Sequence, residues 1–382
     1  MHLEVYAANL RQGGAVVTAA GLIDGILELV SSENPHWLHR LDLIVSPQVR
    51  SNMTNASLVS DITNLQLTVR EDTPKNVVLR GSANDPDVRY VVFGPEYLRS
   101  RARVTVTGFA DGTLIPSWSG DPGDVGIAQV RNPRARIRRA IKKRYLGRYD
   151  AYIVQTAGMA HAISQEYGPK GVAILPNLLS APFPKLEHRQ IHALPPKQES
   201  ETRLFYPAKA YPHKNHEFLA DVSREYQGSF HSALTFVVTL TAEEYLRVFS
   251  NRGPNIINVG VVSAAELPSL YEQTDGLFFP SLNETFSSSP LEAAFMRRPI
   301  VISDRPFARD ILSERASYFD PFDAVDAAQK IHNLRMLLGE NSLALEKQLD
   351  LAQSWAHEHA DARKVAAAYL GFILSVNQRT PN

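Results

Sequence analysis

Short apolar runs alternate with longer segments of helical period along the first half of the chain. Runs that are rich in β-branched and aromatic residues, separated by helix-length segments, are typical of buried parallel strands joined by crossover helices. This pattern predicts a doubly wound α/β domain. The runs are LEVYAA (3–8), LDLIVS (41–46), RYVVFG (89–94), RVTVTGF (103–109), AYIVQT (151–156) and VAILPN (172–177).

The alternation breaks over Ser180–Thr202, a stretch rich in proline and charge with no sustained period, and then resumes. Such a break is typical of an interdomain linker. We therefore predict a domain at 1–178, a linker at 179–202 and a second α/β domain at 203–354. A C-terminal helix, 355–382, is expected to pack back on the first domain. The later runs are RLFYPA (203–208), LTFVVTL (234–240), NIINVG (255–260), GLFFPS (276–281) and PIVIS (299–303).

Composition narrows the class of protein without naming a function. The 382 residues, 44% of them hydrophobic, are enough for two cores. Forty basic residues balance forty acidic ones, so the whole chain has no net charge that would attract nucleic acid or a membrane. The absence of cysteine excludes disulfides, thiolate metal sites and a cysteine nucleophile, and it suits a reducing cytoplasm. The N-terminus lacks a signal-peptide pattern and no apolar stretch approaches eighteen residues, so a soluble, unexported protein is expected.

One segment departs from this charge balance. Residues Arg131–Arg148 hold nine basic side chains and no acidic one, while Ile137, Ile141 and Tyr145 recur at four-residue steps. A solvated helix is the common explanation for such a run. A basic helix with an apolar stripe can also lie on an anionic membrane. Nucleic acid is disfavoured, because the run has a single aromatic residue and no recognised binding motif.

Ligands of open α/β sheets bind beyond the carboxyl ends of the strands, where the segment ETFSSSPLE (284–292) is expected to lie. Glu292 has a purely structural explanation, because Ser289-Pro290-Leu291-Glu292 fits a capping box. Glu284 has none, since it precedes the helix and has no cation nearby in sequence. The residues between them would present backbone amides at a helix N-terminus, which is an anion site. Two carboxylates that flank such a site suit a ligand with phosphate between two sets of hydroxyls.

Two other strand ends carry candidate ligand contacts. Lys209 and Lys214 follow RLFYPA and could face a diphosphate, although solvation is the more common explanation for either lysine taken singly. Gly13 and Gly14 follow the first strand and open a helix, where glycine allows a ligand to approach the backbone. Taken alone, that pair is better explained by a plain turn.

The order of these features resembles the retaining glycosyltransferases of family 4, which have the GT-B fold. The resemblance rests on Gly13-Gly14, on Lys214, on NVGVVSAAELPSLYEQTDGLFFPS (258–281), and on E-x7-E followed by LEAAFMRRPIVISD (291–304); it is densest over 203–312. It implies that Glu284 contacts sugar hydroxyls and that Glu292 holds the ribose. It also implies that Lys214 binds the diphosphate together with the amides of Thr285, Phe286, Ser287 and Ser288, and that the loop of Gly260, Val261 and Val262 lies along the base.

Two positions depart from the family pattern. Lys209 stands where members commonly have arginine, and lysine keeps the charge but loses the bidentate fork, so its phosphate role is in doubt. Many members have a histidine near the sugar after the fourth N-terminal strand, where this chain reads GFADG (108–112). Asp111 is the candidate to replace it, with an ordinary turn aspartate as the alternative.

The resemblance implies sugar transfer from a nucleotide diphosphate sugar to a glycan or lipid-linked acceptor, with retention of configuration and without an essential metal. Surface polysaccharide synthesis in the cytoplasm, peripheral to the membrane, is the expected setting. No metal is expected at Asp85-Pro86-Asp87, which lies in a loop, or at His188 and His192, which lack a third ligand. The alternatives are a non-catalytic GT-B protein that binds a glycan or a partner, and a sugar-nucleotide epimerase or phosphorylase on the same fold.

Overall fold

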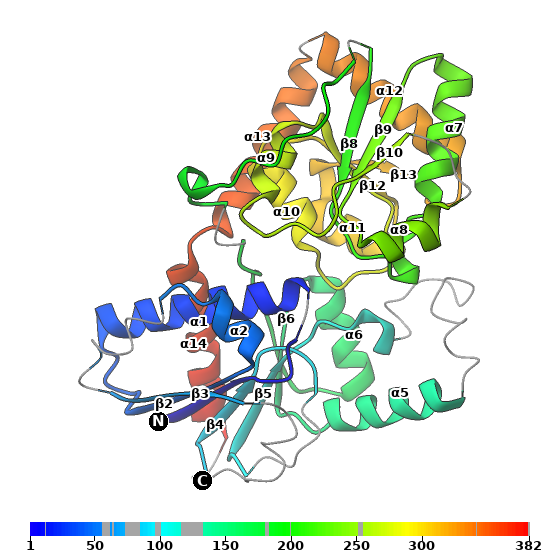
Figure 1. Ribbon diagram of the computed structural model, residues 1–382. Helices are drawn as coiled ribbons and strands as arrows, with labels where there is room; N and C mark the ends of the chain where they lie inside the picture. Colours follow the sequence, from blue (N-terminus) through cyan, green and yellow to red (C-terminus); the bar gives the residue numbers. More distant parts are fainter. Residues whose placement is uncertain are drawn as a thin grey trace. The chain divides into compact units, whose positions relative to one another are not determined.

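The computed structural model describes residues 1–11, 13–55, 62, 65–72, 85–95, 101–115, 133–179, 183–198, 200–250, 255–340 and 342–380. These residues fall into two compact units (Figure 1). The first unit contains the described residues up to Leu178 and those from Asp361 onward, and the second runs from Leu179 to Ala360. Each unit is built on one parallel sheet, so the predicted pair of α/β domains is confirmed.

The sheet of the first unit has the strand order β3-β2-β1-β4-β5-β6-β7. The order reverses between β1 and β4, and this switch point is where doubly wound sheets commonly bind ligands. The edge strand β3 was not predicted, because polar residues break its apolar pattern and several of its side chains are exposed. The strands are β1 (His2–Ala7), β2 (Arg40–Val45), β3 (Gln66–Glu71), β4 (Val88–Val91), β5 (Val104–Gly108), β6 (Ala151–Val154) and β7 (Gly171–Ile174).

Two long helices, α1 (Gly14–Glu33) and α14 (Ala362–Arg379), pack together in the core of the first unit. They cross so closely that a Cβ atom on Gly25 would lie 2.4 Å from the carbonyl oxygen of Ala362. By length and composition α1 could cross a membrane, but 61% of its apolar window is buried inside the protein. Packing in this core therefore accounts for its apolar character. Among the described residues of this unit, the remaining α-helices are α2 (Pro47–Asn52), α5 (Pro133–Leu146) and α6 (Ala157–Tyr167).

The C-terminal helix differs from its predicted extent. The segment from 355 onward does not form one helix, because α13 (Leu343–Glu358) ends before α14 begins. The side chain of Asp361 caps α14 by accepting a hydrogen bond from the amide of Lys364. The start of the predicted helix therefore belongs to α13 of the second unit, and α14 belongs to the first.

The sheet of the second unit has the order β10-β9-β8-β11-β12-β13. Its central strands β8 and β11 are fully buried, as their continuous apolar runs predict. The strands are β8 (Thr202–Tyr206), β9 (Leu234–Val238), β10 (Ile256–Asn258), β11 (Gly276–Phe279), β12 (Ile300–Ser303) and β13 (Ser317–Phe319). The other α-helices are α7 (Phe218–Phe230), α8 (Ala242–Phe249), α9 (Leu267–Glu272), α10 (Ser288–Phe295), α11 (Pro306–Leu312) and α12 (Ala324–Gly339).

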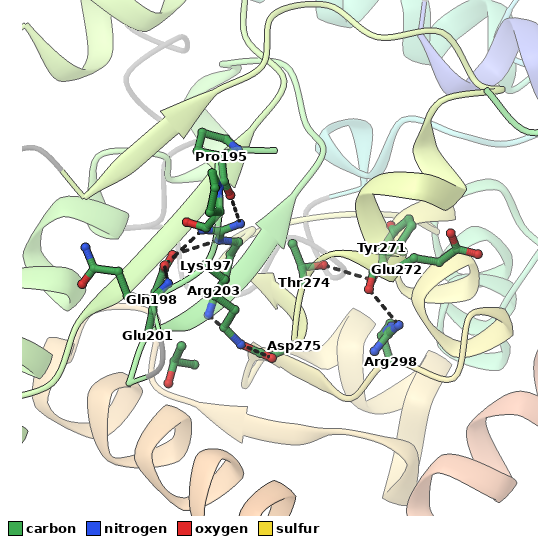
Figure 2. A network of polar contacts seen from close by, with 12 residues as sticks. Pro195, Lys197, Gln198, Glu201, Arg203, Tyr271, Glu272, Thr274, Asp275 and Arg298 are labelled. Atoms are coloured by element: carbon green, nitrogen blue, oxygen red, sulfur yellow. Dashed lines mark hydrogen bonds and ion pairs between the residues drawn. The ribbon is translucent and has the colours of Figure 1, made fainter. Parts of the chain in front are cut away.

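The described part of segment 179–202 clusters with the second unit and is tied to the amino ends of β8 and β11 (Figure 2). Buried Arg203 donates to both carboxylate oxygens of Glu201 at 2.9 and 3.0 Å, and to the carbonyl oxygen of Pro195 at 2.9 Å. The carboxylate of Asp275 accepts from the Arg203 amide and from the Lys197 ammonium. This network lies at the edge of the sheet opposite the carboxyl ends of the strands.

Candidate functional site

The candidate site of the second unit begins where the adjacent strands β8 and β11 end. The loop after β8 contains the 3₁₀ turn η4 (Pro212–Lys214), and the loop after β11 leads to α10. The carbonyl oxygen of His213 accepts from the Leu282 amide at 2.7 Å and from the Ser281 hydroxyl at 3.2 Å. These bonds join the two loops into one structure.

Lys214 and Glu284, predicted from separate motifs, meet across these loops. The Lys214 ammonium forms an ion pair with Oε1 of Glu284, and the same oxygen accepts from the Ser281 hydroxyl at 2.6 Å. Both side chains are largely shielded, with 14% and 11% exposed, so the pair is more than a solvated surface contact. The Tyr206 hydroxyl donates to the Lys214 carbonyl oxygen at 2.7 Å and fixes the backbone of the turn.

Buried His216 shapes the loop after β8. Its Nε2 atom lies 3.1 Å from the carbonyl oxygen of Ala208, and its ring packs 4.7 Å from that of Tyr206. Because a carbonyl oxygen can only accept, Nε2 carries the proton. Burial lowers the pKa of His216 to about 4, so the ring is neutral at pH 7. Lys209 lies exposed in the same loop.

The start of α10 differs from the predicted capping box. The N-cap is Ser287, whose side chain makes no capping hydrogen bond, and the helix begins at Ser288. Glu292 is therefore the fifth helical residue, and the reciprocal bond of a capping box, which needs the third residue, cannot form. Ser289 instead donates to the carbonyl oxygen of Pro207 at 3.3 Å, so that α10 is tied to the loop after β8. The capping explanation of Glu292 is wrong.

Glu292 is held by a tyrosine from a neighbouring helix. The hydroxyl of Tyr271, on α9, lies 3.2 Å from Oε2 of Glu292 and 3.1 Å from the carbonyl oxygen of Ser289. Burial raises the pKa of Tyr271 well above its ordinary value, and the carboxylate of Glu292 raises it further, so the hydroxyl stays a donor. Glu292 is itself 4% exposed.

The residues between Glu284 and Glu292 differ in their burial and in their contacts. Thr285 and Ser287 are buried, and Ser288 opens the helix. The ring of Phe286 stacks on that of His359, with centroids 6.0 Å apart. The backbone of this segment therefore leads directly into the positive end of the α10 dipole.

The loop after β10 has a defined shape. Gly260 has φ = 77°, and a Cβ atom there would meet nothing within 4 Å, so glycine is favoured by backbone conformation and not by crowding. The side chain of Asn258 accepts from the amides of Leu240 and Gly260 at 2.9 and 3.2 Å. Val261 is 73% exposed and Val262 is partly buried.

Three predicted residues lie in the first unit. Gly13 is the N-cap of α1 with φ = 76°, and Gly14 is the first residue of that helix. Asp111, after β5, forms an ion pair with Lys142 at 2.7 Å and is the N-cap residue of the 3₁₀ turn η2 (Gly112–Leu114). The structure brings Glu284, Glu292 and Lys214 into one unit, and it leaves these three in the other.

Several residues that shape the site were not predicted from the sequence. Tyr271 and Ser281 hold the two glutamates, and Asn258 holds the loop after β10. Ser281 had a signal, because it is the first polar residue after a buried strand. Tyr271 had none, since it lies in an apolar helical pattern and meets Glu292 only through tertiary packing.

The described residues include no group of three His, Asp or Glu side chains placed to hold a metal ion. Asp87 accepts from the His2 amide at 2.7 Å, at the amino end of β4. Nδ1 of His192 lies 2.9 Å from Oε1 of Glu266. The side chain of His188 lies outside the described set.

Part of the chain is similar in sequence to known glycosyltransferases. Residues 201–336 match the family model described as glycosyl transferases group 1. A 144-residue stretch is 27% identical to the O-antigen chain mannosyltransferase RfbU of Salmonella typhimurium, covering 37% of this chain and 40% of that protein. The chain thus matches less than half the length of this curated relative.

Solved structures are similar over 78% to 99% of the chain. A glycosyltransferase from Rickettsia africae is 11% identical with a TM-score of 0.65, covering 99% of each chain. HepE of Anabaena, solved with UDP-glucose, is 12% identical with a TM-score of 0.61, covering 98% of this chain and 100% of its own. TarM of S. aureus is 15% identical with a TM-score of 0.54, covering 78% of this chain and 57% of its own. At such identities the similarity is one of fold, and the chain has the GT-B fold with a second unit similar in sequence to group 1 glycosyl transferases.

Proposed function

We propose that the protein is a glycosyltransferase that moves a sugar from a nucleotide diphosphate sugar to a glycan or lipid-linked acceptor, with retention of configuration, in surface polysaccharide synthesis. The observation that carries the proposal is the Lys214 and Glu284 pair at the carboxyl ends of β8 and β11, beside the N-terminus of α10. The match of residues 201–336 and the similarity to an O-antigen mannosyltransferase support it.

The chemistry of glycosyl transfer requires a diphosphate to depart while the sugar carbon gains positive charge. A lysine and helix amides aimed at the departing charge stabilise it more in the transition state than in the bound donor. Lys214 and the segment from Thr285 to Ser288 would supply these groups without an essential metal. Lys209 would add long-range charge from its exposed position.

The ion pair of Lys214 with Glu284 suggests how the donor would be accommodated. When a diphosphate arrives, the ammonium has a second anion to bind, and the carboxylate becomes a more available acceptor for sugar hydroxyls. Ser281 would hold Glu284 in place through this exchange, since it bonds the same oxygen. Glu292 would bind the ribose from its position beside Tyr271, and Gly260, Val261 and Val262 would line the base. Asp111, Gly13 and Gly14 are proposed for the acceptor side.

The proposal is tested by measuring thermal stabilisation against a panel of nucleoside diphosphates and their sugars. A ligand at a hundredfold its dissociation constant stabilises by about 2.7 kcal/mol. The ligand that stabilises most is then used in a transfer assay with Glu284→Gln. That variant should bind nucleoside diphosphate normally and lose most of its turnover.

The control is Glu314→Gln, which removes an exposed carboxylate from the same unit. Turnover near the wild-type level in Glu284→Gln contradicts the assignment. Stabilisation by a nucleotide sugar without any transfer, across a broad set of acceptors, would instead indicate a non-catalytic binding protein.

A further inference from the structure

Helix α5 exposes its isoleucines, whereas a helix that only covers the core of the first unit would bury them. Ile137 and Ile141 expose 61% and 44% of their surface. The Lys142 and Lys143 side chains expose only 36% and 28%. A surface helix normally buries its apolar residues and extends its lysines into water.

Ion pairs explain how the lysines come to face the protein. Lys142 pairs with Asp111 at 2.7 Å, and Lys143 pairs with Glu166 at 2.5 Å. Leu146, at the end of the helix, is 1% exposed and anchors it. At about 100° per residue, Leu146 lies opposite Ile137 on the helix, so the anchored side and the isoleucine side are different faces.

The outward face combines isoleucines with arginines. Ile137 and Ile141 point about 40° apart, and Arg144 lies within about 20° of Ile137. Arg136 and Arg138 lie about 100° to either side of Ile137, at the borders of this face, and all three arginines are exposed. From 136 to 148 the chain holds seven basic residues and no acidic one. The acidic partners described above, Asp111 and Glu166, pair with Lys142 and Lys143.

We propose that this outward face of α5 docks on an anionic lipid bilayer. Isoleucines enter the boundary between headgroups and acyl chains, while the flanking arginines bind lipid phosphates, which is how interfacial helices bind membranes. A nucleic-acid backbone would satisfy the arginines but would leave the isoleucines in water. The combination of the two on one face therefore favours the membrane. The proposal does not depend on the reaction that the protein catalyses.

The test is flotation of the full-length protein with vesicles of phosphatidylcholine alone and of phosphatidylcholine with phosphatidylglycerol. Wild type is expected to float only with the anionic vesicles and to be released by high salt. Arg136→Gln/Arg138→Gln/Arg144→Gln should lose roughly 100-fold in partitioning, since each arginine near an anionic surface contributes about a factor of five. Ile137→Ser/Ile141→Ser should lose roughly tenfold or more.

Matched controls remove the same groups from other exposed helices. Leu246→Ser/Leu343→Ser deletes two leucines that are 61% and 85% exposed, and Arg224→Gln/Lys347→Gln/Lys364→Gln removes three charges. Both should float as wild type does. All variants change exposed positions, so circular dichroism and thermal unfolding should match wild type.

Three results would overturn the proposal. The first is equal flotation with neutral and anionic vesicles. The second is unchanged flotation of Ile137→Ser/Ile141→Ser. The third is that wild type does not float but binds RNA, and that the arginine variant loses this RNA binding while the isoleucine variant keeps it. The surface would then be a nucleic-acid site.

Discussion

Replacing Glu292 by glutamine tests the proposed ribose contact most directly. Glutamine has nearly the same shape, and its carbonyl oxygen can still accept from the Tyr271 hydroxyl, which lies 3.2 Å from Oε2 in the wild type. The cap of α10 is unaffected, because Glu292 is the fifth helical residue and Ser287 is the N-cap. The substitution therefore removes the charge of a buried acceptor while keeping its shape.

The expected loss follows from the strength of hydrogen bonds to charged groups. Such bonds contribute about 1.5 to 3 kcal/mol, so nucleoside diphosphate affinity should fall by roughly 10- to 150-fold. Isothermal titration calorimetry measures the loss, with urea unfolding as the check that the fold is unchanged. A nucleotide that lacks both ribose hydroxyls should bind weakly to wild type and should lose little further in the variant, because the contact is absent in both.

Affinity near the wild-type value for the intact nucleotide would refute the reasoning. Since capping is not an alternative role, Glu292 would then be a buried carboxylate that only supports the packing of α9 on α10. Tyr271→Phe sharpens the test, because it removes the donor that orients the carboxylate and leaves the charge in place. Its loss of affinity should be smaller than that of Glu292→Gln, and it too should vanish with the nucleotide that lacks ribose hydroxyls.

Three further predictions concern the second unit. Lys214→Ala should weaken nucleoside diphosphate binding far more than nucleoside binding in titration calorimetry; equal losses would mean that the lysine does not face the diphosphate. Arg203→Met should cost about 3 to 5 kcal/mol of unfolding free energy in urea, because it leaves the buried carboxylate of Glu201 without the arginine that pairs with it. The double variant Glu201→Leu/Arg203→Met should recover most of this loss. A loss below about 1 kcal/mol in Arg203→Met would contradict the reasoning. Hydrogen bonds from His192 and from Ser263 lower the pKa of Glu266 to about 2. The contribution of Glu266 to stability is therefore present above the unfolded pKa near 4.5 and is lost as pH falls toward 2. The unfolding midpoints of wild type and Glu266→Gln should converge between about pH 5 and pH 2. A constant difference between the two midpoints would argue against these stabilising hydrogen bonds.

Parallel strands that are buried on both faces could be predicted from sequence because each is a continuous apolar run. LFY in β8 and LFF in β11 are examples, and both are fully buried. Edge strands are different, since one side is unpaired and their residues are partly exposed. For that reason β3 and the three-residue β13 escaped prediction, whereas the edge strands β7 and β10 were predicted because their apolar runs are uninterrupted.

The candidate site was also only partly predictable from the sequence. Glu284 and Lys214 could be proposed from sequence, because polar residues that follow buried parallel strands are brought to one edge of the sheet. Their mutual ion pair could not, because it depends on β8 lying next to β11, an order that the sequence pattern does not specify. The start of α10 was likewise misjudged: tertiary contacts of Ser289 and Glu292 outweighed a good local capping signal.

Sequence alone determined the alternation of strands and helices, the two sheets, and the residue types at the strand ends, because these follow from local periodicity and from where polar residues interrupt it. Tertiary structure alone decided which faces and which partners those residues have. Helix α5 shows the difference, since its sequence fits either a solvated or a membrane-binding helix. The ion pairs of Lys142 and Lys143 with acids distant in sequence turn the isoleucines outward, and no local pattern encodes that choice.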